Sequence, residues 1–294
     1  MNGRLIVLSF SILVLFGACS RSTDDLIRDL SSDSAMARRS AASKLMMRTG
    51  DHELVGKLVD LLNADDERLS YISMQILGSL ADSIAVDPLG AVLDNPNPVY
   101  RATACWSLGT IGHDSAFPFL LKGLSDESPD VRYAAVIALG HLYYPPAVDH
   151  LYPMFRDEAD SVRVRAIQSI YNYRLVEGAN VIAADFAIPL ADRVETVRYV
   201  AVQALGGAWE EARGWVFADS TVAGELLVEA LRDQSKYVRI EAIMSLGKIR
   251  HQDAVPVLKA MYNISSVDEE VAISEAIKNI NGETFPPPSG GTNE

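Results

Sequence analysis

Aspartates and arginines that recur at one spacing are the residues of this 294-residue chain with the most chemical potential. Carboxylates and cations held close together can act as general acids and bases. An aspartate stands six residues before an arginine at five places: Asp33 and Arg39, Asp126 and Arg132, Asp157 and Arg163, Asp192 and Arg198, and Asp233 and Arg239. The pattern is broken at Ala64 and Ser70 and altered at Asn95 and Arg101, and the last unit has neither partner. Such regular recurrence favours a structural role, so no catalytic residue is predicted.

Other motifs of known chemistry do not occur in the sequence. It has no glycine-rich phosphate loop, no zinc-protease helix signature and no nucleophile elbow. Five histidines are present, and none pairs with a second metal ligand at helical spacing. We therefore predict no metal and no cofactor. The net charge of −13 argues against nucleic acid as a partner, because binding to phosphates depends on lysine and arginine.

The two cysteines, Cys19 and Cys105, stand in different surroundings. Cys19 follows a basic residue, Arg4, a mainly apolar run over residues 5–16, and the small pair at residues 17 and 18. A run of this length is too short to span a bilayer, so residues 1–18 are interpreted as a cleaved export signal. Cys105 lies beside the apolar helical stripe marked by Ala104 and is expected to be a small, buried or half-buried thiol.

Residues 15–19 resemble the end of a bacterial lipoprotein signal, although Phe16 stands where leucine is commoner. In that family the cysteine thiol receives a diacylglyceryl group, the chain is cut before the cysteine, and the new amino terminus is acylated. The resemblance implies a lipidated Cys19 on a short tether, residues 19–23, that attaches the protein to a membrane. Ser20, rather than an aspartate, follows the cysteine, which implies the outer membrane and a periplasmic location. An ordinary secretory signal with an incidental cysteine is the alternative.

One phrase recurs over residues 24–281 and indicates stacked units. Its small central residue marks each copy: Ala42, Ser73, Ala104, Ala135, Ala166, Ala201, Ala242 and a degenerate Ala276. The first four intervals are each 31 residues, followed by 35, 41 and 34. Each unit is predicted to be two helices, because apolar residues within it follow helical spacing. A glycine after the last leucine, at positions 78, 109, 140, 206 and 247, is expected to form a left-handed C-cap.

The repeated phrase resembles the HEAT repeats, particularly the short ones of the phycobilin-lyase-like group. The resemblance spans residues 24–281 and implies an all-α, right-handed solenoid of about eight stacked helical hairpins. In the family, the aspartates and arginines form a ladder between neighbouring units. Physical reasoning agrees, since an aspartate in a turn can accept hydrogen bonds from helix N–H groups and from an adjacent guanidinium. Residues 282–294, with three consecutive prolines, are interpreted as a disordered tail.

The resemblance also places the second helix of each unit on the concave surface of the solenoid. Uncharged and aromatic residues are expected there, which favours a binding surface: Tyr71, Trp106, Tyr133, Ile137, Tyr199, Gln203 and Met244. An irregular stretch, residues 206–221, adds Trp209 and Trp215 as candidate contacts. The alternatives are that tight curvature buries the concave residues and that the tryptophans fill a gap between units.

The function predicted from these features is a non-catalytic, lipid-anchored scaffold that binds a protein partner through its concave face. Two rivals stay open. The first is a bilin-lyase-like or other enzyme or accessory protein, which would hold its substrate in the same groove. The second is a purely structural component of the cell envelope without a discrete ligand.

Overall fold

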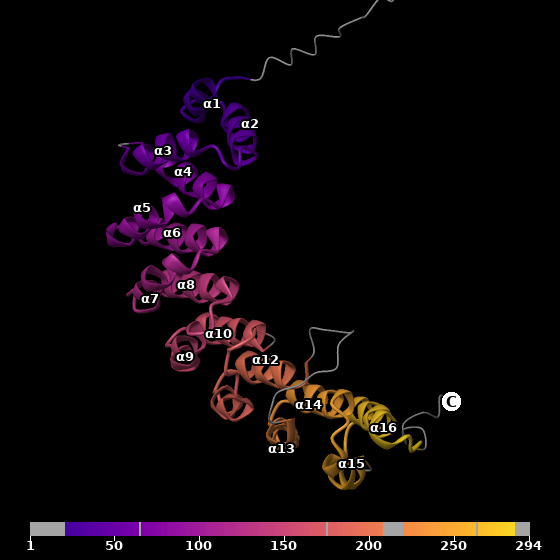
Figure 1. Cartoon of the computed structure of the whole chain (residues 1–294). Coiled ribbons are helices and arrows are strands. Elements are labelled where there is room, and N and C mark those ends of the chain that lie inside the picture. Colours follow the sequence, from indigo (N-terminus) through magenta and orange to yellow (C-terminus); the bar gives the residue numbers. More distant parts are fainter. Residues whose placement is uncertain (1–20, 65, 175, 208–219, 263, 286–294) are drawn as a thin grey trace, which may run out of the picture.

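The computed structural model describes residues 21–64, 66–174, 176–207, 220–262 and 264–285. This part of the chain consists of helices and the turns between them, and no strand occurs in it. Its sixteen α-helices form eight hairpins that stack one after another along a curved path (Figure 1). The predicted all-α solenoid is confirmed. The export signal predicted over residues 1–18, Cys19 and the tryptophans at 209 and 215 lie outside the described residues.

The helices alternate between two rows. The first helices of the hairpins are α1 (Thr23–Leu30), α3 (His52–Asp60), α5 (Val86–Ala91), α7 (Phe117–Leu124), α9 (Ala147–Leu151), α11 (Ala187–Leu190), α13 (Ser220–Ala230) and α15 (Val255–Tyr262). The second helices are α2 (Ala35–Met46), α4 (Glu67–Leu80), α6 (Pro98–Ile111), α8 (Pro129–Leu142), α10 (Asp160–Tyr173), α12 (Glu195–Leu205), α14 (Lys236–Lys248) and α16 (Val267–Asn281). Short 3₁₀ turns adjoin the first row: η1 (Leu61–Asn63), η2 (Ser83–Ala85), η3 (Val92–Asp94), η4 (Asp114–Ala116), η5 (Tyr152–Arg156), η6 (Ala183–Phe186) and η7 (Gln252–Ala254).

The core runs along the whole stack because no hairpin covers its own apolar face. In α8, the stripe formed by Val131, Ala134, Ala135, Ala138 and Leu139 is at most 1% exposed. Each second helix from α4 onward contacts the next second helix, so the small residues of one unit pack against the following unit. Buried apolar residues form one continuous cluster from the first hairpin to the last. Stacking, rather than any single unit, therefore supplies the hydrophobic stabilisation.

The first unit is rotated by one residue from the predicted register. Ala41 and Leu45 are buried in α2, whereas Ala42, the expected central residue, is only partly buried. The same shift affects the polar side of the unit. Arg38, and not Arg39, donates to the main-chain carbonyls of residues 32 and 33, at 2.6 and 2.9 Å. A terminal unit packs against only one neighbour, so one fewer constraint acts on the register of its helix.

The glycines at 78, 109, 140, 206 and 247 do not form the predicted left-handed caps, since none of them has a positive φ. Helices α4, α6 and α8 continue past these glycines and end at left-handed residues further on, Ala81, Gly112 and Tyr143. The glycines instead allow close helix contact. A β-carbon added at Gly109 would lie 2.6 Å from Cα of Ala138, nearer than packed atoms approach.

The two ends of the described chain are closed by local contacts. Ser22 caps α1 by accepting a hydrogen bond from the N–H of Asp25 at 3.1 Å. After α16, the ring of Phe285 packs against that of Tyr262 with 4.9 Å between ring centres. The disordered tail predicted over residues 282–294 stays a prediction; within it, Phe285 contacts Tyr262 and Glu283 accepts a hydrogen bond from Lys259. The remaining residues, 286–294, lie outside the described part of the chain.

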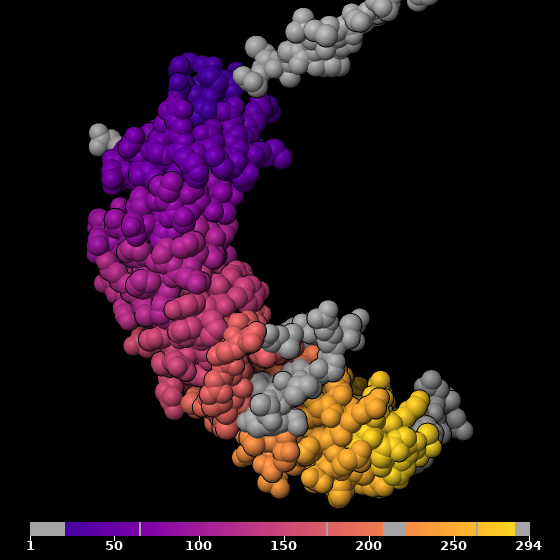
Figure 2. Space-filling model, in the orientation of Figure 1, coloured from indigo at the N-terminus to yellow at the C-terminus, as the bar shows by residue number. Residues whose placement is uncertain are grey.

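The molecule is a crescent, and the two rows of helices lie on opposite sides of it. Figure 2 shows the crescent in the same orientation as Figure 1, in which the even-numbered helices follow the inner, concave side. The odd-numbered helices lie on the outer side. Within the described residues, no helix combines the length and apolar character that crossing a membrane requires.

Candidate functional site

A hollow on the concave side lies between α4 and α6, and we call it the aromatic hollow. Its volume is about 510 Å³. Its lining includes Met46, Tyr71, Gln75, Thr103, Trp106 and Ser107. Tyr71 and Trp106 are 37% and 45% exposed, which is unusual for large aromatic side chains. Two accessible aromatic groups beside one depression form the kind of surface that dominates protein interfaces.

Local packing explains why this hollow exists. Gly78 of α4 faces Ser107 of α6, and an added β-carbon would lie 3.0 Å from Cα of Ser107. The close approach brings the neighbouring turns of α4 and α6 together beneath the hollow. The hydroxyl of Ser107 donates to the main-chain carbonyl of Met74 at 2.8 Å, and that of Thr103 donates to Val99 at 2.7 Å. Because these hydroxyls are satisfied by the backbone, the aromatic rings provide the accessible binding groups.

The other predicted concave residues are arranged less simply. Ile137 is only 4% exposed, although it lines a second hollow between α8 and α10. Met244 is 38% exposed, and Gln203 is half-buried. The predicted contacts Trp209 and Trp215 are outside the described residues. Binding through any of these positions stays a prediction.

Two concave tyrosines are held by charged side chains that the sequence analysis did not single out. Nη2 of Arg165 donates to the hydroxyl of Tyr133 at 2.8 Å. The hydroxyl of Tyr199 donates to Oε2 of Glu241 at 3.0 Å. Burial, together with the nearby negative charge of Glu241, raises the pKa of Tyr199. The sequence pattern suggested an uncharged concave face, but the structure places Arg165 and Glu241 on it.

A signal for these charges was present in the repeat. Arg165 and Glu241 occupy the third position after the first stripe residue, where the fourth unit has the small core residue Ala134. A charge at a position that is apolar in another unit needs a partner or a ligand, because burying it alone is costly. Comparing units position by position would have revealed both residues.

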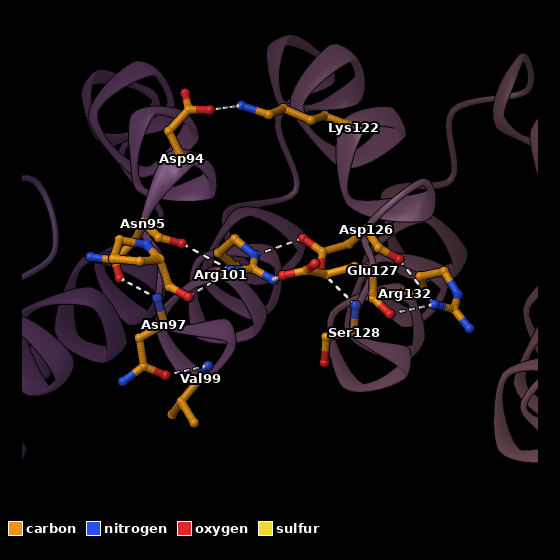
Figure 3. A network of polar contacts seen from close by, with 11 residues as sticks. Asp94, Asn95, Asn97, Val99, Arg101, Lys122, Asp126, Glu127, Ser128 and Arg132 are labelled. Atoms are coloured by element: carbon orange, nitrogen blue, oxygen red, sulfur yellow. Dashed lines mark hydrogen bonds and ion pairs between the residues drawn. The ribbon is translucent and has the colours of Figure 1, made fainter.

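The recurring arginines join each unit to the next. Nε and Nη2 of Arg101 donate to the two carboxylate oxygens of Asp126 at 2.7 and 2.8 Å, and Nη1 donates to the main-chain carbonyl of Asn95 at 3.0 Å (Figure 3). The same carboxylate accepts the N–H of Ser128 at 2.9 Å. Bidentate pairs also connect Arg132 with Asp157, Arg163 with Asp192, and Arg198 with Asp233.

The last rung differs from the predicted ladder. Nε of Arg239 donates to the carboxylate of Glu269 at 2.7 Å, so the eighth unit has a partner, although it has no aspartate at the usual place. Glu269 also accepts from the hydroxyl and the N–H of Ser266 in a capping box at the start of α16. Glu269 lies within the first turn of α16, and its longer side chain reaches the guanidinium of Arg239 from there. The six-residue spacing of aspartate and arginine therefore does not detect this rung.

Burial and hydrogen bonding act in opposite directions on the ladder carboxylates. Burial favours the protonated form, but hydrogen bonds from arginine and from main-chain N–H groups outweigh it. The pKa values of Asp126, Asp157, Asp233 and Glu269 are therefore below their usual range. These carboxylates are ionised at neutral pH and fully engaged, so they contribute to the scaffold and have no proton to exchange.

Other reactive side chains are placed away from the concave surface or lack partners of the needed kind. Cys105 is fully buried in α6, and burial raises the pKa of its thiol to about 12, so it stays protonated. Nδ1 of His52 lies 2.5 Å from Oδ2 of Asp82, which is an inter-unit contact. Among the described residues, no group of three or more histidine, cysteine, aspartate or glutamate side chains could hold a metal ion.

Fold and ladder together define an α-solenoid of helical hairpins with arginine–carboxylate rungs. The family model of the HEAT repeats matches residues 86–170 and 185–278, more than half of the chain. The chain therefore belongs to the HEAT-repeat family.

Two curated relatives are detected by sequence, and many solved structures are similar in shape. Phycocyanobilin lyase subunit beta of Thermosynechococcus vestitus is 36% identical over 110 residues, 37% of this chain and 51% of that protein. The chain thus spans about half the length of that lyase subunit. Deoxyhypusine hydroxylase of Candida albicans is 23% identical over 252 residues, 73% of this chain and 74% of that protein. The structure of the YibA protein of Escherichia coli superposes with a TM-score of 0.60 at 21% identity, covering 90% of this chain and 93% of that one, which supports the fold alone.

These relatives contradict the prediction that the chain is not an enzyme. Both curated relatives bear the names of enzymes, a lyase subunit and a hydroxylase, so the similarity points toward enzymatic function. The prediction depended on the lack of short catalytic motifs. In a solenoid, residues that meet on one surface come from units about 31 residues apart, so a functional site need not leave a local motif.

Proposed function

We propose that this chain is an enzyme or enzyme-accessory subunit that holds a protein on its concave face while that protein is covalently modified. The aromatic hollow carries the proposal, because its two accessible rings belong to α4 and α6, which follow the inner side of the crescent. The similarity to a phycocyanobilin lyase subunit supports a role in attaching a group to a protein. A bilin is one candidate for that group.

The position of the hollow favours a large partner over a free small molecule. The depression opens along the concave side of a crescent, so a ligand bound there meets successive second helices as well. A protein surface can contact several of these helices at once, whereas a small ligand would contact only α4 and α6. Aromatic groups provide affinity at such an interface, and the surrounding polar groups provide selectivity.

The binding part of the proposal is tested by crosslinking in cells that express the tagged full-length chain. Trp106→Ala, alone or with Tyr71→Ala, should reduce the yield of the crosslinked partner about tenfold or more, as expected for an interface hot spot. Tyr237→Ala is the matched control, because Tyr237 is 61% exposed but belongs to no hollow described above. Equal yields from the Trp106 and Tyr237 variants would contradict the role of the hollow.

The enzymatic part is tested on the captured partner by mass spectrometry. The partner should carry a covalent modification that is lost when the chain is deleted and is not restored by Trp106→Ala. Purified chain incubated with phycocyanobilin tests the bilin possibility through a change in the visible absorption spectrum. A partner whose mass does not depend on the chain would contradict a modifying role.

The location of the protein is a further proposal, supported by the sequence and by the surface of the first unit. A lipid chain on Cys19 would attach the protein to the cell envelope, most simply to the outer membrane on the periplasmic side. The exposed side of α2 carries Met36, Arg39, Lys44 and Met47 and no acidic residue, in contrast to the acidic chain as a whole. Apolar and basic groups together suit contact with an anionic membrane surface.

A further inference from the structure

A second hollow on the concave side lies between α8 and α10 and has a different chemistry. Its volume is about 340 Å³. We call it the arginine hollow, and its main lining residues are Ile137, His141, Arg165, Gln168, Asn172 and Arg174. No aspartate or glutamate occurs among its described lining residues. A cationic depression without a carboxylate is unexpected in a chain with a net charge of −13.

The guanidinium of Arg165 sits differently from those of the ladder arginines. It donates to the hydroxyl of Tyr133 at 2.8 Å, and its carbon lies 5.2 Å from the centre of the Tyr133 ring. Its Nε is buried and has no hydrogen-bond partner among the described residues. Arg101, Arg132, Arg163 and Arg198 each have two carboxylate oxygens within hydrogen-bonding distance.

A buried donor on a charged group is costly unless an acceptor satisfies it. The side chain of Arg165 lines the hollow, so an acceptor placed in the hollow can reach the guanidinium. Nε itself is buried, so an anionic oxygen in the hollow would meet the accessible part of the guanidinium and balance its charge. Because no described carboxylate lines the hollow, the charge of Arg165 favours an anionic ligand.

The side chains around Arg165 are also hydrogen-bond donors that suit an anion. Arg174 ends α10, with its guanidinium carbon 3.7 Å from the centre of the Tyr171 ring. Gln168 and Asn172 lie one turn apart on α10 and can donate hydrogen bonds from their amides. Arg174 is itself engaged, since its Nη1 donates to the main-chain carbonyl of Tyr171 at 2.9 Å. The Arg165 guanidinium with amide donors beside it matches a carboxylate, whose two oxygens accept bidentate bonds from arginine.

We propose that the arginine hollow binds a carboxylate from an acidic segment of the protein held on the concave face. The source of the carboxylate rests on the proposed function, whereas the anion site itself follows from the geometry of the hollow. A volume of about 340 Å³ accommodates an acidic side chain but no folded element. The aromatic hollow and the arginine hollow lie on the same row of helices, so one extended segment can reach both.

The test uses a fluorescein-labelled hexaglutamate peptide and the full-length chain, with binding followed by fluorescence anisotropy at low and at moderate salt. Arg165→Gln should weaken binding about tenfold or more, the effect expected from losing charge-assisted hydrogen bonds. Arg156→Gln is the matched control, since it removes the same charge from an exposed position in η5. It should change affinity less than about twofold, as a screened surface charge does. Equal weakening by both variants would overturn the site.

A second variant keeps the arginine and guards against misfolding. Gln168→Glu places a carboxylate inside the hollow, where it should occupy the guanidinium and reduce peptide binding as strongly as Arg165→Gln does. Thermal unfolding of each variant reports on the fold. Full peptide affinity in Gln168→Glu would overturn the proposal even if Arg165→Gln failed to fold.

Competition identifies the anion, and partner capture separates this inference from the proposed function. Glutarate should displace the peptide better than inorganic phosphate, and the reverse order would overturn the carboxylate assignment. Tyr237→Ala, at a residue outside both hollows, should leave peptide affinity unchanged. If the peptide fails to bind while partner capture still depends on Trp106, the anion site is wrong and the proposed function stands.

Discussion

At the scale of single residues, the ladder works because each carboxylate is used completely. Asp157 accepts both guanidinium bonds of Arg132, at 2.6 and 2.8 Å, and the N–H of Ala159 at 2.9 Å. The side chains of Arg132 and Asp157 are 14% and 4% exposed, so water cannot readily replace either partner. A rung is thus a buried ion pair in which removing one member strands the other.

Asp157→Ala should lower the free energy of unfolding by about 3 kcal/mol, because Arg132 would be left as an uncompensated, largely buried charge. Lys122→Ala is the control: it breaks the ion pair with Asp94, in which both side chains are well exposed, and should cost less than about 1 kcal/mol. Urea denaturation followed by circular dichroism measures both. Similar midpoints for the two variants would show that the rungs add little to stability.

The ladder also predicts how stability depends on pH. Because the folded pKa values of Asp126, Asp157 and Asp233 lie below the usual 3.8, the unfolded chain binds protons more readily as the solution is acidified. The contribution is fully present well above pH 3.8 and is lost as the pH falls through the folded values. The melting temperature should therefore drop between about pH 5 and pH 3.

Asp157→Ala serves again as the comparison, since one titrating rung is missing from it. Its melting temperature should be lower at neutral pH and fall less steeply on acidification. Parallel curves for the variant and the unaltered protein would show that the rung at Asp157 does not cause the acid sensitivity.

At the scale of elements, glycines set the distance between successive second helices. In α6, Gly109 lies against Ala138 of α8, with no room for a β-carbon. Gly140 and Gly247 face Ser169 and Ala276 in the same way. The repeat thus pairs a glycine in one unit with a small residue in the next, and the spacing of the stack follows from that pair.

Gly109→Ala should destabilise the protein by about 1–3 kcal/mol, the usual cost of overpacking, because α6 and α8 must move apart. Gly56→Ala is the control. A β-carbon at Gly56 in α3 meets nothing within 4 Å, so the better helix propensity of alanine should stabilise the chain by about 0.5–1 kcal/mol. Opposite signs in thermal unfolding are expected, and a stabilising Gly109→Ala would contradict the packing role.

The periodicity of the sequence was sufficient to predict the hairpins and the stripe of α8, and the resemblance to HEAT repeats placed the second helices on the concave side. It was not sufficient to predict where a helix ends. Residues such as Ala81 and Tyr143 adopt the left-handed conformation without being glycine, so the glycine inside the helix was mistaken for its cap. The functional positions were also incomplete. Arg165 and Glu241 sit at a position that is apolar in another unit, and only the folded arrangement shows which tyrosine each one contacts.

At the scale of the whole molecule, the crescent keeps structural and binding chemistry apart. The ladder joins neighbouring units through the turns that precede the second helices, whereas both hollows lie on the concave surfaces of those helices. The residues on the concave surface can therefore change while the ladder keeps the units stacked in the same way. Relatives named as a lyase subunit and as a hydroxylase are consistent with function determined by surface residues rather than by the fold.

The attachment proposed for the N-terminus makes a prediction about the full-length chain. In a bacterial host, Cys19→Ser should abolish incorporation of labelled palmitate and shift the protein from the detergent phase to the aqueous phase on phase separation. Cys105→Ser is the matched control, since its thiol is buried and should leave both readouts unchanged. Equal labelling of the Cys19 variant and the unaltered chain would contradict lipidation at this residue.

The first unit should then contribute a second, weaker membrane contact. The apolar and basic groups on the exposed side of α2 should add to the affinity, because buried apolar area and attraction to anionic lipids both favour binding. Met36→Ser with Met47→Ser is expected to weaken binding of the unlipidated Cys19→Ser protein to vesicles that contain phosphatidylglycerol, whereas Ile264→Ser, at a residue 84% exposed near the opposite end, should not. Sedimentation with the vesicles measures both. If the methionine pair and the Ile264 variant sediment equally, the first unit is not the surface that faces the membrane.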